Sequence, residues 1–230
     1  MFPLRRVKND RLARQAPSKP EIMTDLPFRE TFEGPGLNPS LRWHREPTRW
    51  GIEPSRPCLW IEPNAATDFW RKTHYGFEAD NGHFLFAEAP GDFVVATKVT
   101  LRPVHQYDQA GLMVRASPDC WLKTSVEYEP EGPSVLGAVV TNAGYSDWST
   151  QDVPRGVSDV WFRVRVEGMD CLVDASFDGI AWWRIRMAPL LDRRDARPLA
   201  FGPYACSPKE AGFRAEFHFL DVVPGRLDVS

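Results

Sequence analysis

Residues 160–187, VWFRVRVEGMDCLVDASFDGIAWWRIRM, decide the fold of this 230-residue chain. Apolar and polar residues alternate in three short runs, and the dipeptides Glu167-Gly168 and Asp178-Gly179 stand where one run gives way to the next. Alternation with period two is typical of a half-buried strand, and Asp-Gly accepts the positive φ angles of a tight hairpin turn. The stretch therefore predicts a three-stranded antiparallel meander, in which Gly179 has a positive φ in a two-residue turn.

The same alternation continues on the amino-terminal side of this stretch and again after it. Run 92–101 alternates so that its odd-numbered residues share one face, and in run 213–219 the odd-numbered residues are expected to face inward, Phe219 included. Further strands are expected at 107–115, 120–128 and 134–141. Asn81-Gly82 is expected to form another tight turn. Because no segment keeps a helical period for more than about two turns, we predict an all-β sandwich of two antiparallel sheets.

The composition fits one large β domain preceded by a separate arm. Hydrophobic residues make up 43% of the chain, with nine Trp and fourteen Phe, which is enough apolar mass for a thick core between two sheets. In residues 1–20, basic residues outnumber acidic ones six to one, and no periodicity is present. We therefore predict a disordered basic arm at 1–22 and a single sandwich domain at 23–230, with Met23 as an alternative translation start.

The net charge and the lengths of the apolar runs indicate which partners and which cellular compartment to expect. The formal net charge of −3 gives no indication of nucleic-acid binding. The chain has neither the apolar run of a secretory signal nor that of a membrane span, so we expect a cytoplasmic protein without a membrane partner. The cysteines lie far apart without a Cys-x-x-Cys motif and are expected to be free thiols: Cys58, Cys120, Cys171 and Cys206.

Several ordered motifs resemble known families. Ala175-Ser-Phe-Asp-Gly-Ile-Ala-Trp-Trp183 resembles a hairpin that is common in concanavalin A-like lectin and glucanase domains. A second series runs through Thr67-Asp-Phe-Trp70, Tyr75-Gly76, Tyr107-Asp-Gln-Ala-Gly-Leu-Met-Val114, Trp121-Leu-Lys123, Val126-Glu-Tyr128, Val139-Val-Thr141 and Ser146-Asp-Trp-Ser149. This series resembles a family of unknown function labelled regulation-of-enolase-like, and is similar to the C-terminal sandwich domain of some β-xylosidases. The resemblance covers about residues 26–222 and implies a concanavalin A-like jelly-roll β-sandwich, but no activity.

A candidate site lies on the polar side of the strand expected at 120–128. Alternation places Leu122 and Val126 on one face, and Trp121, Lys123 and Glu127 on the other. In a jelly roll, the concave face of one sheet is such a polar surface. The candidate ligand-binding residues are His74, Tyr75, Gln109, Trp121, Lys123, Glu127, Asp147 and Trp148. The simpler interpretation is a solvated sheet face on which Lys123 and Glu127 pair.

Three functions compete for these residues. Aromatic faces beside charged hydrogen-bonding groups suit a non-catalytic protein that binds a carbohydrate or a small polyol, and we expect this function. The first alternative is a glycoside hydrolase or lyase that uses Glu127 and Asp147 as its two carboxyl groups. The second is a regulatory module that binds a protein partner or a second copy of the chain. We expect no metal site, because the histidines, cysteines and aspartates lack ligand spacing, and no cofactor, because no Gly-rich phosphate loop follows a strand and opens a helix.

Overall fold

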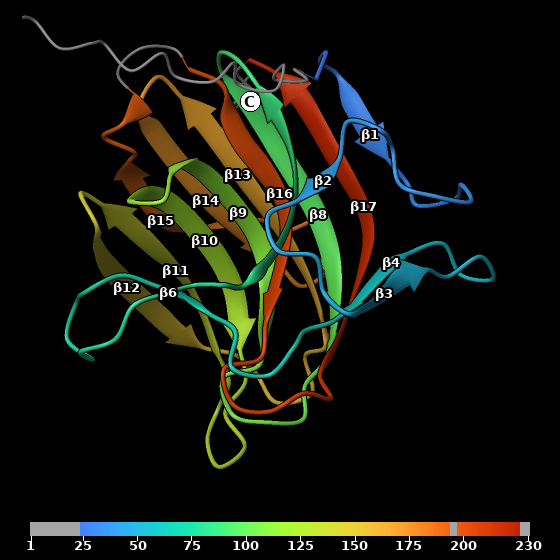
Figure 1. Ribbon diagram of the computed structural model, residues 1–230, viewed down its shortest axis with the longest axis vertical. Coiled ribbons are helices and arrows are strands. Elements are labelled where there is room, and N and C mark those ends of the chain that lie inside the picture. Colours follow the sequence, from blue (N-terminus) through green and yellow to red (C-terminus); the bar gives the residue numbers. More distant parts are fainter. Residues whose placement is uncertain (1–23, 194–196, 226–230) are drawn as a thin grey trace, which may run out of the picture.

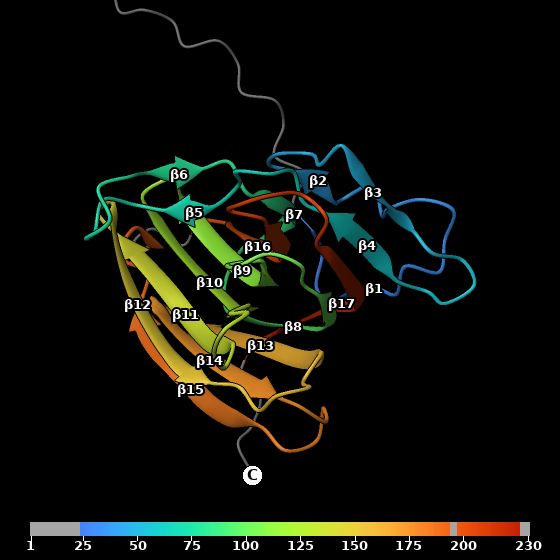
Figure 2. The same ribbon diagram turned by 90° about the horizontal axis from the view of Figure 1, so that it is seen from below.

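In the computed structural model, which describes residues 24–193 and 197–225, two large antiparallel sheets lie face to face (Figures 1 and 2). The seven-stranded sheet has the order β12 (Tyr145–Asp152), β11 (Val135–Asn142), β10 (Cys120–Glu127), β9 (Gln109–Ser117), β16 (Leu199–Cys206), β7 (His83–Ala89) and β2 (Arg42–Trp43). The eight-stranded sheet has the order β15 (Trp183–Pro189), β14 (Asp170–Ser176), β13 (Asp159–Glu167), β8 (Phe93–Arg102), β17 (Arg214–Pro224), β4 (Leu59–Glu62) and β3 (Arg49–Ile52), and β1 (Phe28–Glu30) pairs with β17. The predicted sandwich is confirmed, whereas the expected arm at 1–22 and the start at Met23 lie outside the described residues.

The predicted meander is formed by β13, β14 and β15, which pair as antiparallel neighbours. Gly168 and Met169 alone separate β13 from β14, and Gly168 has a φ of 56°. Gly179 has a φ of 74°, as predicted, but the two-residue turn is wrong because the longer loop 177–182 joins β14 to β15. The Asp178 carboxylate shapes this loop, since its Oδ1 accepts hydrogen bonds of 2.8 Å from the backbone of Ile180 and Ala181.

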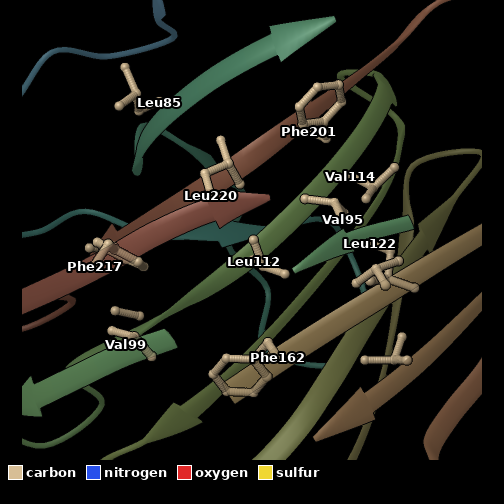
Figure 3. Packing of buried hydrophobic residues seen from close by; sticks show 14 of the residues in the cluster. Leu85, Val95, Val99, Leu112, Val114, Leu122, Phe162, Phe201, Phe217 and Leu220 are labelled. Carbon is tan, nitrogen blue, oxygen red and sulfur yellow. The ribbon is translucent and has the colours of Figure 1, made fainter. Parts of the chain in front are cut away.

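The hydrophobic core fills the space between the two large sheets (Figure 3). Leu112, Val114 and Leu122 come from the seven-stranded sheet, and Val95, Val99, Phe162, Phe217 and Leu220 come from the eight-stranded sheet. The odd-numbered residues of 93–101 share one face, as predicted, and this face is buried. In β17 the register shifts between Phe217 and Phe219, so that after this point the even-numbered residues Leu220 and Val222 face inward. The inward position predicted for Phe219 is therefore wrong.

A smaller third layer covers part of the seven-stranded sheet on the side away from the core (Figure 2). It consists of β5 (Phe69–Trp70) and β6 (Ala79–Asp80) with their connection. The Phe69 ring packs edge-on against Trp121 and Tyr204, with centroids 6.2 Å away in both cases. A bidentate ion pair from Arg115 to Asp80, at 2.5 and 2.9 Å, fastens β6 to β9.

Gly82 lies where the chain passes from this layer into the seven-stranded sheet. The tight turn predicted at Asn81-Gly82 is wrong, because these residues link β6 to β7 and the two strands do not pair. A Cβ atom on Gly82 would lie 2.3 Å from the Phe69 ring and 2.6 Å from Cys206 Sγ. Only glycine fits at this position, because the Phe69 ring and Cys206 Sγ lie too close to leave space for a Cβ atom.

Other sequence expectations concern the cysteines, the membrane and metals. All four cysteines are buried free thiols. In the part of the chain that the structure describes, no helix has the length and apolarity that a membrane crossing requires. The described residues also contain no group of three or more His, Cys, Asp or Glu side chains that is suited to a metal ion.

Candidate functional site

A cleft of about 570 Å³ opens on the outer face of the seven-stranded sheet, beside the layer of β5 and β6. Strands β9, β10 and β11 provide its floor, which contains Gln109, Lys123, Glu127 and Val139. Its walls include Asp68, Trp70, Tyr75, Phe77, Tyr107, Glu129, Trp148 and Lys209. Polar groups thus lie at the bottom and aromatic rings around them.

The floor is one continuous hydrogen-bond network. Lys123 Nζ donates to Asp68 Oδ1 and to Gln109 Oε1, both at 3.0 Å. The Gln109 amide also donates from Nε2 to Glu127 Oε2 at 3.0 Å, and its Oε1 accepts from the Tyr204 hydroxyl at 3.3 Å. These bonds fix the orientation of the Gln109 amide, so the floor presents a defined set of donors and acceptors.

Glu127 is the floor residue with the most strongly altered ionisation. Burial raises the pKa of the Glu127 carboxyl from 4.5 to about 7; the Lys123 charge opposes this rise, and the charges of Asp68 and Glu129 add to it. The carboxyl therefore changes its charge near neutral pH. A carboxyl group of this kind can donate a hydrogen bond when protonated and accept one when ionised.

Aromatic side chains form the upper part of the cleft. Tyr75, Phe77 and Trp148 are 53%, 45% and 39% exposed, which is high for rings of this size. Tyr75 lies between Trp70 and Phe77, at centroid distances of 5.2 and 6.1 Å. Exposed rings that are held by their neighbours offer flat apolar surfaces to a ligand without a large loss of side-chain entropy.

The cleft brings together five of the eight residues that the sequence singles out. They are Tyr75, Gln109, Lys123, Glu127 and Trp148. His74 is not among the lining residues; its exposed ring packs against Tyr75 at 4.9 Å. The predicted face of β10 is correct for Lys123 and Glu127, since Leu122 and Val126 point into the core.

Trp121 lies on the predicted face but is no part of an open surface. Its side chain is fully buried in the cluster beneath β5, together with Phe69, Met113 and Tyr204. The prediction of an exposed binding platform at Trp121 is wrong, because the segment that contains Phe69 folds over this part of the sheet. The indole Nε1 donates to the Pro118 carbonyl at 3.2 Å and takes no part in the cleft.

Asp147 also lies away from the cleft. Trp148 pairs with Val139, which faces the cleft, so the preceding residue Asp147 points to the opposite side of β12. There it forms an ion pair with Arg186 of β15 at 2.8 Å, across the edges of the two sheets. The alternative in which Glu127 and Asp147 meet as two catalytic carboxyl groups is therefore wrong.

Several lining residues are absent from the sequence-based set. Asp68 and Trp70 belong to the motif Thr67-Asp-Phe-Trp70, and Tyr107 begins another quoted motif, so the resemblance contained the signal for all three. Phe77, Glu129 and Lys209 occur in stretches without strand alternation. Their contribution depends on how the loops fold over the sheet.

The two facing antiparallel sheets form a jelly-roll β-sandwich of the concanavalin A-like kind, and the cleft lies on the outer face of one of them. A family model described as "Protein of unknown function (DUF1349)" matches residues 43–224, and the chain belongs to this family.

Two relatives from Saccharomyces cerevisiae are similar over most of the chain. "Regulation of enolase protein 1" is 38% identical over 157 residues, which are 68% of this chain and 77% of that protein. The crystal structure of a functionally unknown yeast protein has a TM-score of 0.74 at 33% identity and covers 82% of this chain and 98% of its own. The GH43 BlXynB protein from Bacillus licheniformis has a TM-score of 0.67 at 18% identity, covering 92% of this chain and 42% of its own, and this likeness concerns the fold alone.

Proposed function

We propose that this protein binds a carbohydrate or a small polyol without catalysis, in the cleft on the outer face of the seven-stranded sheet. The observation that carries the proposal is the combination of exposed rings, Tyr75, Phe77 and Trp148, above a fixed polar floor. Sugars present an apolar face of C–H groups and a periphery of hydroxyl groups. The rings suit the first and the floor suits the second.

The dimensions and polarity of the cleft support a ligand of this size. Its volume of about 570 Å³ falls within the range of small-molecule sites. The Lys123 ammonium can donate a third hydrogen bond beyond those to Asp68 and Gln109, and the carboxylates of Asp68 and Glu127 supply acceptors. Hydroxyl groups act as both donor and acceptor, so a polyol can satisfy both kinds of partner.

Binding is favoured over glycoside hydrolysis by the direction of the carboxyl groups. That chemistry commonly requires two carboxyl groups on either side of the scissile bond. Asp147, the expected partner of Glu127, points to the other side of β12 and pairs with Arg186. The Asp68 carboxylate already accepts hydrogen bonds from Lys123 and from the backbone of Phe69, so it holds the network of the cleft together.

Calorimetric titration with a panel of neutral mono- and disaccharides tests the proposal. Trp148→Ala should weaken the affinity for any sugar that binds by at least about tenfold, which corresponds to about 1.4 kcal/mol. Tyr145→Ala is the matched control, because Tyr145 lies on the same strand, is 61% exposed and does not line the cleft. No binding by any sugar, or equal losses in both variants, would contradict a carbohydrate cleft.

A further inference from the structure

The cleft contains three acidic side chains and two basic ones, and among the described residues only one ion pair joins them. Asp68, Glu127 and Glu129 face two lysines, Lys123 and Lys209. The Lys123 ammonium is already bonded to Asp68 at 3.0 Å. Lys209 Nζ lies 5.2 Å from the centre of the Tyr107 ring, and no ion pair joins it to a described carboxylate.

Glu127 is the acid on the strand floor of the cleft. Its Oε2 accepts from Gln109, while no group of the described residues donates a hydrogen bond to its Oε1. Glu129 likewise accepts one hydrogen bond from a side-chain amide, that of Gln106 at 2.9 Å, but it lies beyond the end of β10, in the wall of the cleft and not on its floor. A half-buried carboxylate with a free oxygen at the bottom of a cleft is a strong acceptor for a charged donor.

The walls above Glu127 suit the same kind of charge. The aromatic residues Tyr75, Phe77 and Trp148 line the cleft, and the face of an aromatic ring attracts cations. The same rings accept the apolar face of a sugar. A ligand that has both a positive charge and the apolar face of a sugar therefore contacts the floor and the walls together.

We infer that the cleft selects an amino sugar, whose ammonium group lies beside the Glu127 carboxylate while its ring packs on Trp148. The inference rests on the proposed function and specifies its ligand class. An ammonium group stabilises the ionised form of the Glu127 carboxyl, whereas a neutral sugar supplies no counter-charge to that form. A uronic acid would bring a second carboxylate to a site that already has more acids than bases, and repulsion would weaken it.

Calorimetry at pH 7 and low salt, with matched ligands, tests this inference. The 2-amino, neutral and uronate forms of glucose, galactose and mannose are each titrated into the full chain. In at least one series the amino sugar should bind about tenfold more tightly than the neutral sugar, and the uronate more weakly than either. Glu127→Gln should lower the ratio between amino and neutral sugar to about one. Glu131→Gln, which alters an exposed acid outside the cleft, should preserve that ratio.

Each outcome has a distinct meaning. Equal affinity for the amino and neutral forms would overturn the amino-sugar inference and leave the proposed function standing. A preference for the uronate would overturn it in favour of Lys123 and Lys209 as the groups that select the ligand. An amino-sugar preference that survives Glu127→Gln would also overturn it. No binding by any form up to about 10 mM would overturn both the inference and the proposed function.

Discussion

Lys123 Nζ lies 3.0 Å from Asp68 Oδ1, and this ion pair joins β10 to the residue that leads into β5. The two side chains are 5% and 19% exposed, so water screens their charges only partly. The pair therefore has two consequences. It fastens the layer of β5 and β6 to the sheet, and it sets the orientation of the cleft floor through Gln109.

Lys123→Met is expected to lower the free energy of unfolding by about 2–4 kcal/mol, because it leaves the Asp68 carboxylate largely buried and without its cation. Urea unfolding measures the change. The double variant Lys123→Met with Asp68→Asn should recover part of the loss, since no charge then remains unpaired. Loss of less than about 0.5 kcal/mol in Lys123→Met would mean that the pair behaves like an exposed surface ion pair.

Trp121→Ala and Trp148→Ala should differ sharply in stability. Trp121 is fully buried beneath β5, so its truncation should cost about 3–5 kcal/mol. Trp148 is 39% exposed, and its truncation should cost about 1 kcal/mol or less. Chemical denaturation of both variants checks this, and similar costs would show that the two rings are not divided between core and cleft.

The effect of Glu127 on stability should depend on pH. The folded-state pKa of Glu127 is raised from 4.5 to about 7, chiefly by burial. Between these values the unfolded chain has released a proton that the folded protein retains, so this group makes the fold less stable as pH rises from about 4.5 to about 7. At about 1.4 kcal/mol for each pH unit, the full loss is about 3 kcal/mol.

Glu127→Gln should therefore be more stable, relative to the natural protein, at pH 8 than at pH 5, by up to about 3 kcal/mol. Thermal unfolding at both values of pH measures this difference, with Glu131→Gln as the exposed control. A stability difference that is the same at both values of pH would contradict the raised pKa.

Gly82→Ala should destabilise the protein by about 1–3 kcal/mol. The added Cβ would lie 2.3 Å from the Phe69 ring and 2.6 Å from Cys206 Sγ, so β5 would have to shift. Gly36→Ala is the control, because no atom lies within 4 Å of the Cβ that it adds. Equal stability of the two variants, measured by denaturant unfolding, would argue against the close contact of Gly82 with Phe69.

Local alternation predicts most of the sandwich. It places Leu122 and Val126 in the core, Lys123 and Glu127 on the opposite face, and the meander at residues 160–187. It fails where one residue changes the phase of a strand. In β17 the register shift after Phe217 sends Leu220 inward in place of Phe219, and the regular alternation of the sequence gives no sign of this.

The candidate site is less predictable because it depends on a long-range contact. Nothing in the sequence around Trp121 indicates that Phe69 packs on it. The placement of Asp147 could have been corrected from the sequence, since neighbouring residues of one strand face opposite sides and Trp148 is the better partner for the cleft. Asp68 lies far from Lys123 in the chain, so their ion pair is visible only in the folded structure.

The location of the ligand is tested most directly by the indole N–H signals of the tryptophans in two-dimensional NMR spectra, recorded while a sugar from the binding panel is added. Trp148 and Trp70 line the cleft, whereas Trp60, Trp161 and Trp182 each lie under a cationic side chain from the eight-stranded sheet. We predict that the Trp148 and Trp70 signals move in a saturable way and that those of Trp60, Trp161 and Trp182 remain in place. Saturable shifts at Trp60, Trp161 or Trp182, with Trp148 unchanged, would contradict a ligand site in the cleft.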